Sequence, residues 1–254
     1  MSERPFSQGD QRLIVAHRGA SREEPENTMA AFEAAVEAGA GAVEFDVRVT
    51  ADGHAVVMHD ATVGRTTDGS GLIREMTLDA VKRLRTASGS EVPTLGEVLR
   101  ALSGRVAVDI EIKNVPGEPD FEPDRERAVE LVHAALDDVA FVGDVIVSSF
   151  NPLSLAASLQ MRPEVPTGLL TTAEVEAEAA LRFAAAQGFR WTLPYVGRVR
   201  DSADRTAGAA HRAGLLLGTW ITDDPAEAVA LFEAGVDAVA TNDPRSLAAE
   251  LARR

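Results

Sequence analysis

The sequence predicts an α/β protein of the (β/α)8 class, a closed TIM barrel of eight parallel strands with helices around it. The first observation is an alternation of short apolar segments with alanine-rich helical segments along nearly the whole chain. Repeated strand–helix units of this kind are typical of a parallel sheet covered by helices. The second is the length of 254 residues, which suits one barrel. The third is that eight strands remain once a hairpin arm is recognised among nine candidates.

The strand candidates are runs of Val, Ile, Leu and Ala bounded by polar residues or glycine. They comprise residues 13–16, 42–47, 55–58, 106–112, 145–149, 167–170, 189–193, 215–221 and 238–241. The helical candidates alternate with them, at residues 28–38, 95–102, 124–137, 152–160, 172–187, 202–213, 225–234 and 244–253. Four of these helical runs are followed by a glycine, which commonly adopts the left-handed conformation that ends a helix.

The candidate at residues 55–58 is interpreted as a hairpin arm rather than a barrel strand. Thr50-Ala51-Asp52-Gly53 separates it from the preceding apolar run, and Asp-Gly is a signal for a tight turn. A connection this short joins only antiparallel strands, because a parallel crossover needs a dozen or more residues. An open doubly wound sheet is the alternative architecture, and no glycine-rich phosphate loop supports it.

Residues 61–92 interrupt the alternation of strands and helices. This stretch is polar and contains Thr66-Thr67-Asp68-Gly69-Ser70-Gly71. We interpret it as a small insertion after the hairpin that lies over one mouth of the barrel. No linker and no internal repeat divides the rest of the sequence, so residues 1–254 are expected to form a single barrel domain.

The composition excludes several function classes. The 25 basic and 40 acidic residues give a formal charge of −15, which argues against binding to nucleic acid. No apolar run approaches the roughly 20 residues that span a bilayer. Met1–Gln11 lacks the pattern of a secretory signal, so a cytoplasmic location is expected. The absence of cysteine removes disulfides, thiolate nucleophiles and cysteine-ligated metals.

Charged side chains gather where the predicted strands end, which is where barrel enzymes place their active sites. They are His17, Arg18, Glu44, Asp46, His59, Asp109, Glu111 and Lys113. Residues two apart on a strand project to the same side, so up to four carboxylates would meet at one mouth. Such a cluster needs cations, and a divalent ion such as Mg²⁺ or Ca²⁺ suits ligands that are all oxygen. The alternative is a lattice of salt bridges that fills the barrel, with Asp109 as a supporting partner deeper in its strand.

His17 and His59 reach this mouth from different elements. Each alone could be a structural histidine, but together, beside cations and a metal site, they look like a general acid and a general base. The positive charges of Arg18, Lys113 and a metal would neutralise a bound anionic group, for which phosphate is the natural candidate. The remaining histidines lie at the hairpin turn or in helical stretches and are assigned no role.

The ordered set of motifs is more specific than any one of them. It comprises His17-Arg18-Gly19, Pro25-Glu26-Asn27-Thr28, Glu44-Phe45-Asp46-Val47, Asp52-Gly53, His59-Asp60, Arg65-Thr66-Thr67, Pro93-Thr94-Leu95, Glu111-Ile112-Lys113, Ser148-Ser149-Phe150 and Thr219-Trp220. In this order and with these gaps, the series resembles the glycerophosphodiester phosphodiesterase family. The resemblance runs from about residue 13 to residue 250, nearly the whole chain.

The resemblance implies a (β/α)8 barrel that hydrolyses glycerophosphodiesters, with a divalent metal, to glycerol 3-phosphate and an alcohol. The roles carried over by position are acid–base catalysis for His17 and His59, metal ligation for Glu44, Asp46 and Glu111, and phosphate binding for Arg18 and Lys113. Trp220 would form an apolar wall for the substrate, with ordinary core packing as its alternative role. Glu26 is a candidate contact of the site, while Asn27 or Thr28 is expected to cap the first helix.

The sequence departs from the family pattern at two places that face the variable end of the substrate. Ile221-Thr222-Asp223 follows the tryptophan where many relatives have a threonine, and residues 191–195 lack the polar side chains often found there. These departures leave the identity of the released alcohol open, but they do not affect the residues expected to act on the phosphodiester. The expected partner is a small-molecule diester, without nucleic acid or stable membrane association.

Two other functions are alternatives to this prediction. One is a related phosphodiesterase acting on lysophospholipids, which needs apolar surface at the mouth. The insertion offers Leu72, Ile73 and Met76 at most, and the net charge disfavours anionic bilayers. The other is a non-catalytic phosphodiester-binding barrel, which would be marked by loss of a histidine or a metal carboxylate; all of these residues are present.

Overall fold

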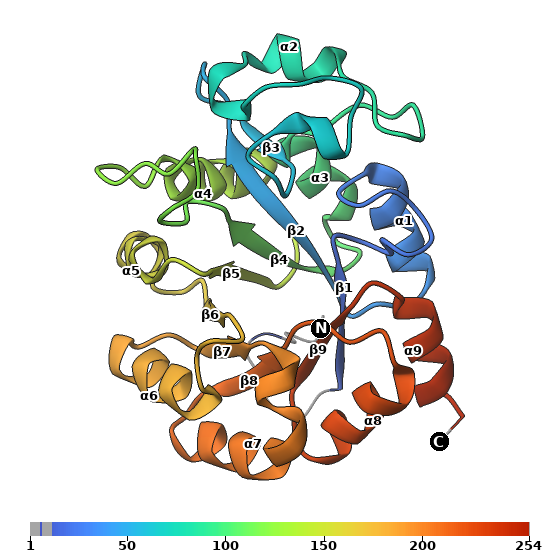
Figure 1. Ribbon diagram of the computed structural model, residues 1–254, viewed down its shortest axis with the longest axis vertical. Helices are drawn as coiled ribbons and strands as arrows, with labels where there is room; N and C mark the ends of the chain where they lie inside the picture. The colour runs from blue at the N-terminus through green and yellow to red at the C-terminus, as the bar shows by residue number, and fades with distance from the viewer. Residues whose placement is uncertain (1–5, 7–11, 254) are drawn as a thin grey trace.

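A computed structural model describes Phe6 and residues 12–253 of the chain (Figure 1). The inference about a secretory signal in Met1–Gln11 therefore lies, apart from Phe6, outside the described residues. Within residues 12–253 no helix is both long enough and apolar enough to cross a membrane.

The strands form a closed barrel, as the sequence predicts. They are β1 (Leu13–His17), β2 (Ala42–Val49), β3 (Ala55–Val57), β4 (Ala107–Ile112), β5 (Val145–Ser149), β6 (Thr167–Thr171), β7 (Trp191–Pro194), β8 (Leu216–Thr219) and β9 (Ala238–Thr241). The sheet order is β1-β9-β8-β7-β6-β5-β4-β2-β3, and pairing of β1 with β2 closes the ring. All neighbours are parallel except β3, which runs antiparallel to β2 as the returning arm of the predicted hairpin. The open doubly wound alternative is therefore wrong.

Helices lie outside the barrel, one after each of its parallel strands (Figure 1). They are α1 (Met29–Glu37), α3 (Leu95–Leu102), α4 (Arg127–Val139), α5 (Pro152–Met161), α6 (Ala177–Gln187), α7 (Ala203–Arg212), α8 (Pro225–Glu233) and α9 (Pro244–Leu251). Their starts follow capping chemistry: the hydroxyl of Thr94 accepts a hydrogen bond from the backbone N–H of Glu97, and the Glu97 carboxylate accepts one from Thr94 N. Thr28 caps α1 through its hydroxyl, which accepts from the backbone N–H of Ala31, as predicted for one of two candidates.

Two helices begin later than the sequence suggests. Helix α6 starts at Ala177 rather than at residue 172, because the preceding residues form a turn in which Arg198 Nε donates to the Ala173 carbonyl. Helix α4 starts at Arg127 rather than at residue 124, because the Glu126 carboxylate before it accepts hydrogen bonds from Asn114 and Ser154. Tertiary contacts therefore outweigh the local helical preference at both starts.

The barrel interior changes from apolar to charged along the strands. Inward residues near the amino ends form an apolar cluster that includes Leu13, Ala42 and Ala107. Trp191 is the largest side chain of this cluster, and its indole Nε1 donates to the Phe6 carbonyl at 3.0 Å. Two and four residues further along β2 the inward positions are Glu44 and Asp46. Because side chains on a strand alternate between faces, β2 and β4 carry this change on their inner faces, whereas the inward residues of β6, β7 and β9 stay apolar.

The segment between β3 and α3 packs around a small apolar cluster of its own. It contains the short 3-10 turns η1 (Val63–Arg65) and η2 (Ile73–Glu75) and the helix α2 (Leu78–Arg83), none of which the polar composition suggested. Ile73 is fully buried in that cluster, and Leu72 and Met76 are partly buried. The apolar residues of the insertion therefore face inward rather than forming an exposed patch.

Candidate active site

The carboxyl ends of β1, β2 and β4 bring together the charged residues that the sequence singled out. Parallel pairing sets His17 opposite Glu44, Glu44 opposite Asp109, and Asp46 opposite Glu111. Lys113 follows directly after β4, and the hairpin arm β3 leads to His59. The register thus places residues more than 90 positions apart in the sequence at one mouth of the barrel.

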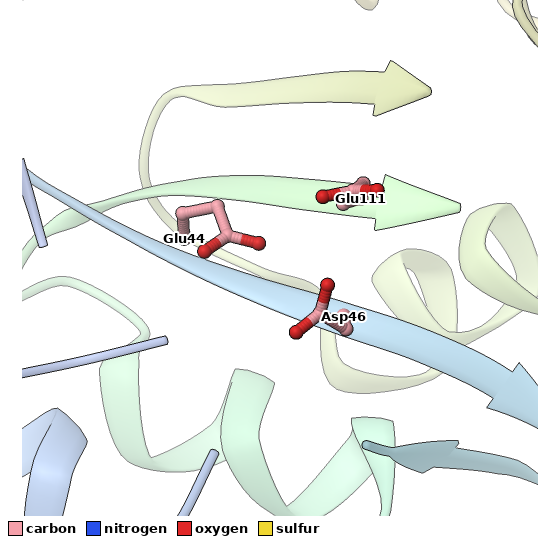
Figure 2. A group of neighbouring side chains, drawn as sticks. All are labelled: Glu44, Asp46 and Glu111. Atoms are coloured by element: carbon pink, nitrogen blue, oxygen red, sulfur yellow. The ribbon is translucent and has the colours of Figure 1, made fainter. Parts of the chain in front are cut away.

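Three carboxylates form a compact oxygen cluster. One carboxylate oxygen from each of Glu44, Asp46 and Glu111 lies within 4.8 Å of the other two, and all three side chains are buried. Figure 2 shows Glu44 and Asp46 on β2 and Glu111 on the neighbouring strand β4. Asp109 is also buried nearby, but it does not belong to this group of three among the described residues.

Two cations lie against the cluster. Lys113 Nζ is 3.0 Å from Asp46 Oδ1 and forms an ion pair with Glu111, and Arg18 Nε is 3.4 Å from Asp46 Oδ2. Burial alone would raise the pKa of Asp46, but Lys113 and Arg18 together outweigh it and lower that pKa. The attraction of Glu111 and Asp46 likewise outweighs burial at Lys113 and raises its pKa. Asp46 and Lys113 are therefore a charged pair at neutral pH.

Among the described residues, Glu44 and Asp109 lack a cation that balances the negative charge of their carboxylates as Lys113 and Arg18 do for Asp46. Burial, followed by repulsion from Asp46 and Glu111, raises the pKa of Glu44, and burial raises that of Asp109 to about 7. Glu44 Oε2 accepts from the backbone N–H of Arg18 at 2.8 Å, whereas Glu44 Oε1 is buried with no hydrogen-bond partner in the described part of the chain. An all-oxygen donor set with an orphaned carboxylate oxygen fits a hard divalent cation.

His17 is held in one tautomer by a chain of hydrogen bonds. Its Nδ1 lies 2.8 Å from Asn242 Oδ1, and Asn242 Nδ2 donates to Asp223 Oδ2 at 2.9 Å. Because Asp223 takes the amide hydrogens, the amide oxygen faces His17, and His17 Nδ1 must carry the proton. The lone pair then lies on Nε2. Burial, with the charge of Arg18, lowers the pKa of His17 to about 4, so the ring is neutral.

His59 has a different partner. Its Nδ1 donates to Asp60 Oδ1 at 2.6 Å, which again leaves Nε2 free. Hydrogen bonds from Arg65 to Asp60 hold the pKa of that carboxyl below its usual range. Burial, with the charges of Lys113 and Arg18, holds the pKa of His59 below its usual value, although Asp46 and Asp60 act in the opposite direction. A carboxylate behind the ring favours the imidazolium form more strongly than the neutral amide behind His17 does.

Arg65 connects the two sides of the site. Its guanidinium binds Asp60 and, through two hydrogen bonds of 2.7 and 2.8 Å, Glu26. Glu26 in turn accepts from Arg18 NH1 at 2.9 Å. His59, Asp60, Arg65, Glu26 and Arg18 thus form one continuous chain of hydrogen bonds across the mouth.

A cavity of about 160 Å³ opens between these groups and the barrel interior. Its polar wall comprises His17, Arg18, Glu44, His59, Asp109, Glu111, Lys113, Ser148 and Thr219. Its apolar wall comprises Val15, Phe150, Leu170, Leu193, Gly218, Trp220, Ala238 and Ala240. Trp220 packs edge-on against Phe150 at 5.3 Å and donates from Nε1 to the Leu193 carbonyl, so it is a fixed wall of the cavity. The cavity can hold a small anion at its mouth and an apolar or mixed group inside.

The structure brings nearly all the predicted site residues to this cavity. Glu26 differs: it does not line the cavity but holds Arg18 and Arg65. Asp46 lies fully buried behind the cavity wall. Asn27 is not the helix cap suggested as one alternative; its Nδ2 donates to Asp46 Oδ2 at 2.7 Å. The contact of Asn242 with His17 could not be predicted from the sequence, because an asparagine before Asp-Pro at a helix start looks like a capping residue.

Comparisons with known proteins agree on one family. The model of the glycerophosphoryl diester phosphodiesterase family matches residues 17–246. The chain is 34% identical over 246 residues to a glycerophosphodiester phosphodiesterase of Caldanaerobacter subterraneus subsp. tengcongensis, which covers 92% of this chain and 96% of that relative. It is 32% identical over 251 residues to a glycerophosphodiester phosphodiesterase of Bacillus subtilis, covering 92% and 85%.

Solved structures show the same likeness. An Oleispira antarctica phosphodiesterase in complex with the product sn-glycerol-3-phosphate has a TM-score of 0.85 and 25% identity, over 98% of this chain and 99% of that one. A glycerophosphodiester phosphodiesterase of Agrobacterium tumefaciens has a TM-score of 0.77 and 29% identity, over 93% and 99%.

Proposed function

The chain belongs to the glycerophosphoryl diester phosphodiesterase family, and on that premise we propose that it hydrolyses glycerophosphodiesters to sn-glycerol 3-phosphate and an alcohol with a divalent metal and two histidines. The observation that carries this proposal is the arrangement of the cavity mouth. An oxygen cluster, two cations and two imidazoles with free Nε2 atoms surround a space suited to one phosphodiester.

Glu44, Asp46 and Glu111 are the residues that would hold the metal, which we take to be Mg²⁺ or Ca²⁺. Four carboxylates, including Asp109, face two cations, Arg18 and Lys113, which leaves an excess of two negative charges when all are ionised. When bound, a divalent cation would supply positive charge to the phosphoryl oxygens and acidify a coordinated oxygen. Arg18 and Lys113 add fixed positive charge at the same mouth and orient the diester.

The histidines differ in their hydrogen-bond partners, and we assign their roles from that difference. His17, neutral and held with its lone pair on Nε2, takes a proton from the attacking oxygen, which is water or the glycerol 2-hydroxyl. His59, whose protonated form the Asp60 carboxylate stabilises, gives a proton to the departing alcohol. A hydroxyl attack would give a cyclic phosphate first, and the same two residues would then open it with water.

The lysophospholipid reading is less well supported. Its requirement for apolar surface near the mouth is not met by Ile73, which is buried in the insertion's own cluster. Residues 61–92 instead reach the site through Arg65. We include in the proposal a cytoplasmic location and one barrel domain over residues 1–254, with residues 61–92 as its insertion.

The experiment that tests the proposal is release of sn-glycerol 3-phosphate from glycerophosphocholine and glycerophosphoethanolamine. We expect release with Mg²⁺ or Ca²⁺, loss of it with chelator, and a fall of at least about 10²-fold in His17→Ala, as for a lost acid or base. No release with either metal would overturn the assigned substrate class. Release that persists in His17→Ala to within tenfold of the parent would overturn the histidine mechanism alone.

A further inference from the structure

Two buried polar side chains at the inner part of the cavity have unsatisfied atoms. Asp109 is 8% exposed and Ser148 is fully buried, yet both line the cavity. The hydroxyl of Ser148 lies close enough to Asp109 to lower the pKa of that carboxyl, which burial raises. Even so, neither Asp109 Oδ1 nor Ser148 Oγ has a hydrogen-bond partner of standard geometry in residues 12–253 or Phe6. Buried polar atoms of this kind normally have a partner, because leaving one unpaired is costly.

The other polar groups of the cavity already have a function or a partner. His17, Arg18, His59 and Lys113 face the phosphate position, and Thr219 donates its hydroxyl hydrogen to the Pro194 carbonyl at 2.9 Å. Glu44 and Glu111 belong to the carboxylate cluster, so Asp109 and Ser148 are the remaining polar groups of the lining. The cavity is also lined by the apolar residues Val15, Leu170, Leu193, Ala238 and Ala240.

We propose that Asp109 and Ser148 form a hydroxyl-binding pair that recognises the glycerol end of the substrate, an inference that rests on the proposed function. With the phosphate at the cationic mouth, a three-carbon polyol reaches inward along Trp220 and Leu193. Its terminal hydroxyl donates to the Asp109 carboxylate, and the Ser148 hydroxyl donates to or accepts from that same hydroxyl. The departing alcohol points out of the mouth to solvent.

The alternative role for Asp109, a metal ligand, fits the geometry less well. The oxygens of Glu44, Asp46 and Glu111 lie within 4.8 Å of one another, and no oxygen of Asp109 joins that group in the described part of the chain. Asp109 is two residues nearer the amino end of β4 than Glu111, so it lies deeper in the barrel. That depth is where the inner end of a substrate lies.

The size of the cavity agrees with a short polyol. Its volume of about 160 Å³ is close to that of a protein cavity of roughly 150 Å³ that holds one benzene ring. A three-carbon unit with two hydroxyls fits such a space. A long acyl chain attached to one of those hydroxyls does not, because a volume of about 160 Å³ is too small for it.

The test compares two diesters that share the leaving group: glycerophosphocholine and 2-hydroxypropyl phosphocholine, which keeps the 2-hydroxyl but lacks the terminal hydroxyl. Choline release gives kcat/KM for each with the metal-loaded full chain. We expect the parent to prefer glycerophosphocholine by at least about 100-fold, since a site built to bind a hydroxyl strongly rejects an analogue without it. In Asp109→Leu and in Ser148→Ala the preference falls at least tenfold, and Asp109→Asn, which keeps one acceptor oxygen, lies between parent and Asp109→Leu.

Thr192→Val is the matched control, because Thr192 also has a buried hydroxyl without a partner in the described residues but does not line the cavity. Its preference is expected to equal that of the parent. If Asp109→Leu does not fold, as judged by thermal unfolding, Ser148→Ala and Asp109→Asn carry the test. An active parent that does not discriminate the two diesters, or variants that keep the parent's preference, would overturn the hydroxyl-binding pair. A parent that releases choline from neither would instead overturn the proposed function.

Discussion

The two histidines of the site are the same residue type with different partners, and the partner decides what each can do. Asn242 presents a neutral oxygen to His17, and Asp60 presents a carboxylate to His59. A carboxylate stabilises the protonated ring that a general acid needs, while an amide fixes the tautomer and favours the charged ring less. The two partners therefore support the proposed roles, base for His17 and acid for His59.

Substrates with different leaving groups distinguish the proposed acid, His59, from the proposed base, His17. His59→Ala should lose at least about 10²-fold in kcat/KM with glycerophosphocholine, because choline leaves as a poor, unprotonated alkoxide. With glycerol 3-phospho-p-nitrophenol the loss should shrink to about tenfold or less, since nitrophenolate needs no proton to leave. His17→Ala should lose about equally with both substrates. The measurement is steady-state kinetics of the parent and both variants; an equal loss in His59→Ala for the two leaving groups would show that His59 is not the acid.

At the scale of elements, residues 61–92 contribute to the site through one side chain. Arg65 binds Asp60 and Glu26 at the same time, so it sets the position of His59 and of Arg18. Arg65→Ala is expected to lower kcat by about ten- to 100-fold, because a small misplacement of catalytic groups costs that much. KM should change less, since neither Arg18 nor Lys113 is removed.

Arg65→Lys should not restore the parent rate, because an ammonium cannot bind two carboxylates in the forked manner of a guanidinium. Arg83→Ala is the control and should leave kcat unchanged, because Arg83 is an exposed residue of α2 whose one ion pair among the described residues is with Asp79 at 3.5 Å. Both rates come from the same choline-release assay. An Arg65→Ala enzyme with the parent kcat would mean that Asp60 and Glu26 hold their positions without the insertion.

Most elements could be predicted from the sequence because apolar periodicity is a local property. The Asp52-Gly53 turn identified the hairpin, and alternation along β2 and β4 placed Glu44 and Glu111 on the inner face. Helix α2 and the late start of α6 could not be predicted in this way. The first packs a small separate cluster inside a polar segment, and the second is decided by Arg198, a side chain from a different loop.

At the scale of the whole molecule, the excess negative charge of the site is part of a net charge of −15. A divalent cation that binds only the folded state stabilises it by about 2.7 kcal/mol at 100 times its Kd. For a chain of this size that corresponds to a rise in Tm of about 5–10 °C. The rise in Tm is measured by thermal unfolding in Mg²⁺ or Ca²⁺ and compared with unfolding in sodium chloride of equal ionic strength.

Glu111→Gln should abolish most of that rise, because it removes one of the three clustered carboxylates. Glu37→Gln, at an exposed position of α1, removes the same charge away from the site and should keep the full rise. A rise that is equal in both variants would show that the ions act on overall charge rather than at the cluster.

The parts of the site that could not be predicted are those assembled by the barrel as a whole. Glu44 and Asp46 are two residues apart, and their shared face follows from strand geometry. His17 and Asn242 are 225 residues apart, and only the closed ring brings them together. Asn27 likewise looked like a helix cap and instead binds Asp46 from a neighbouring element. Sequence reasoning finds the charged residues but not the neutral side chains that orient them.

Closure of the ring by β1, between β2 and β9, has a consequence for the order of events on the ribosome. Synthesis proceeds from the amino terminus at about 5–20 residues per second, so β1 emerges first and β9 last. Until β9 is made, β1 has an unpaired edge that can associate with other chains. The nascent chain also lacks Asn242 and thus the oriented His17. Hydrolytic activity therefore begins only when translation is nearly complete, and a prematurely terminated chain is both aggregation-prone and inert.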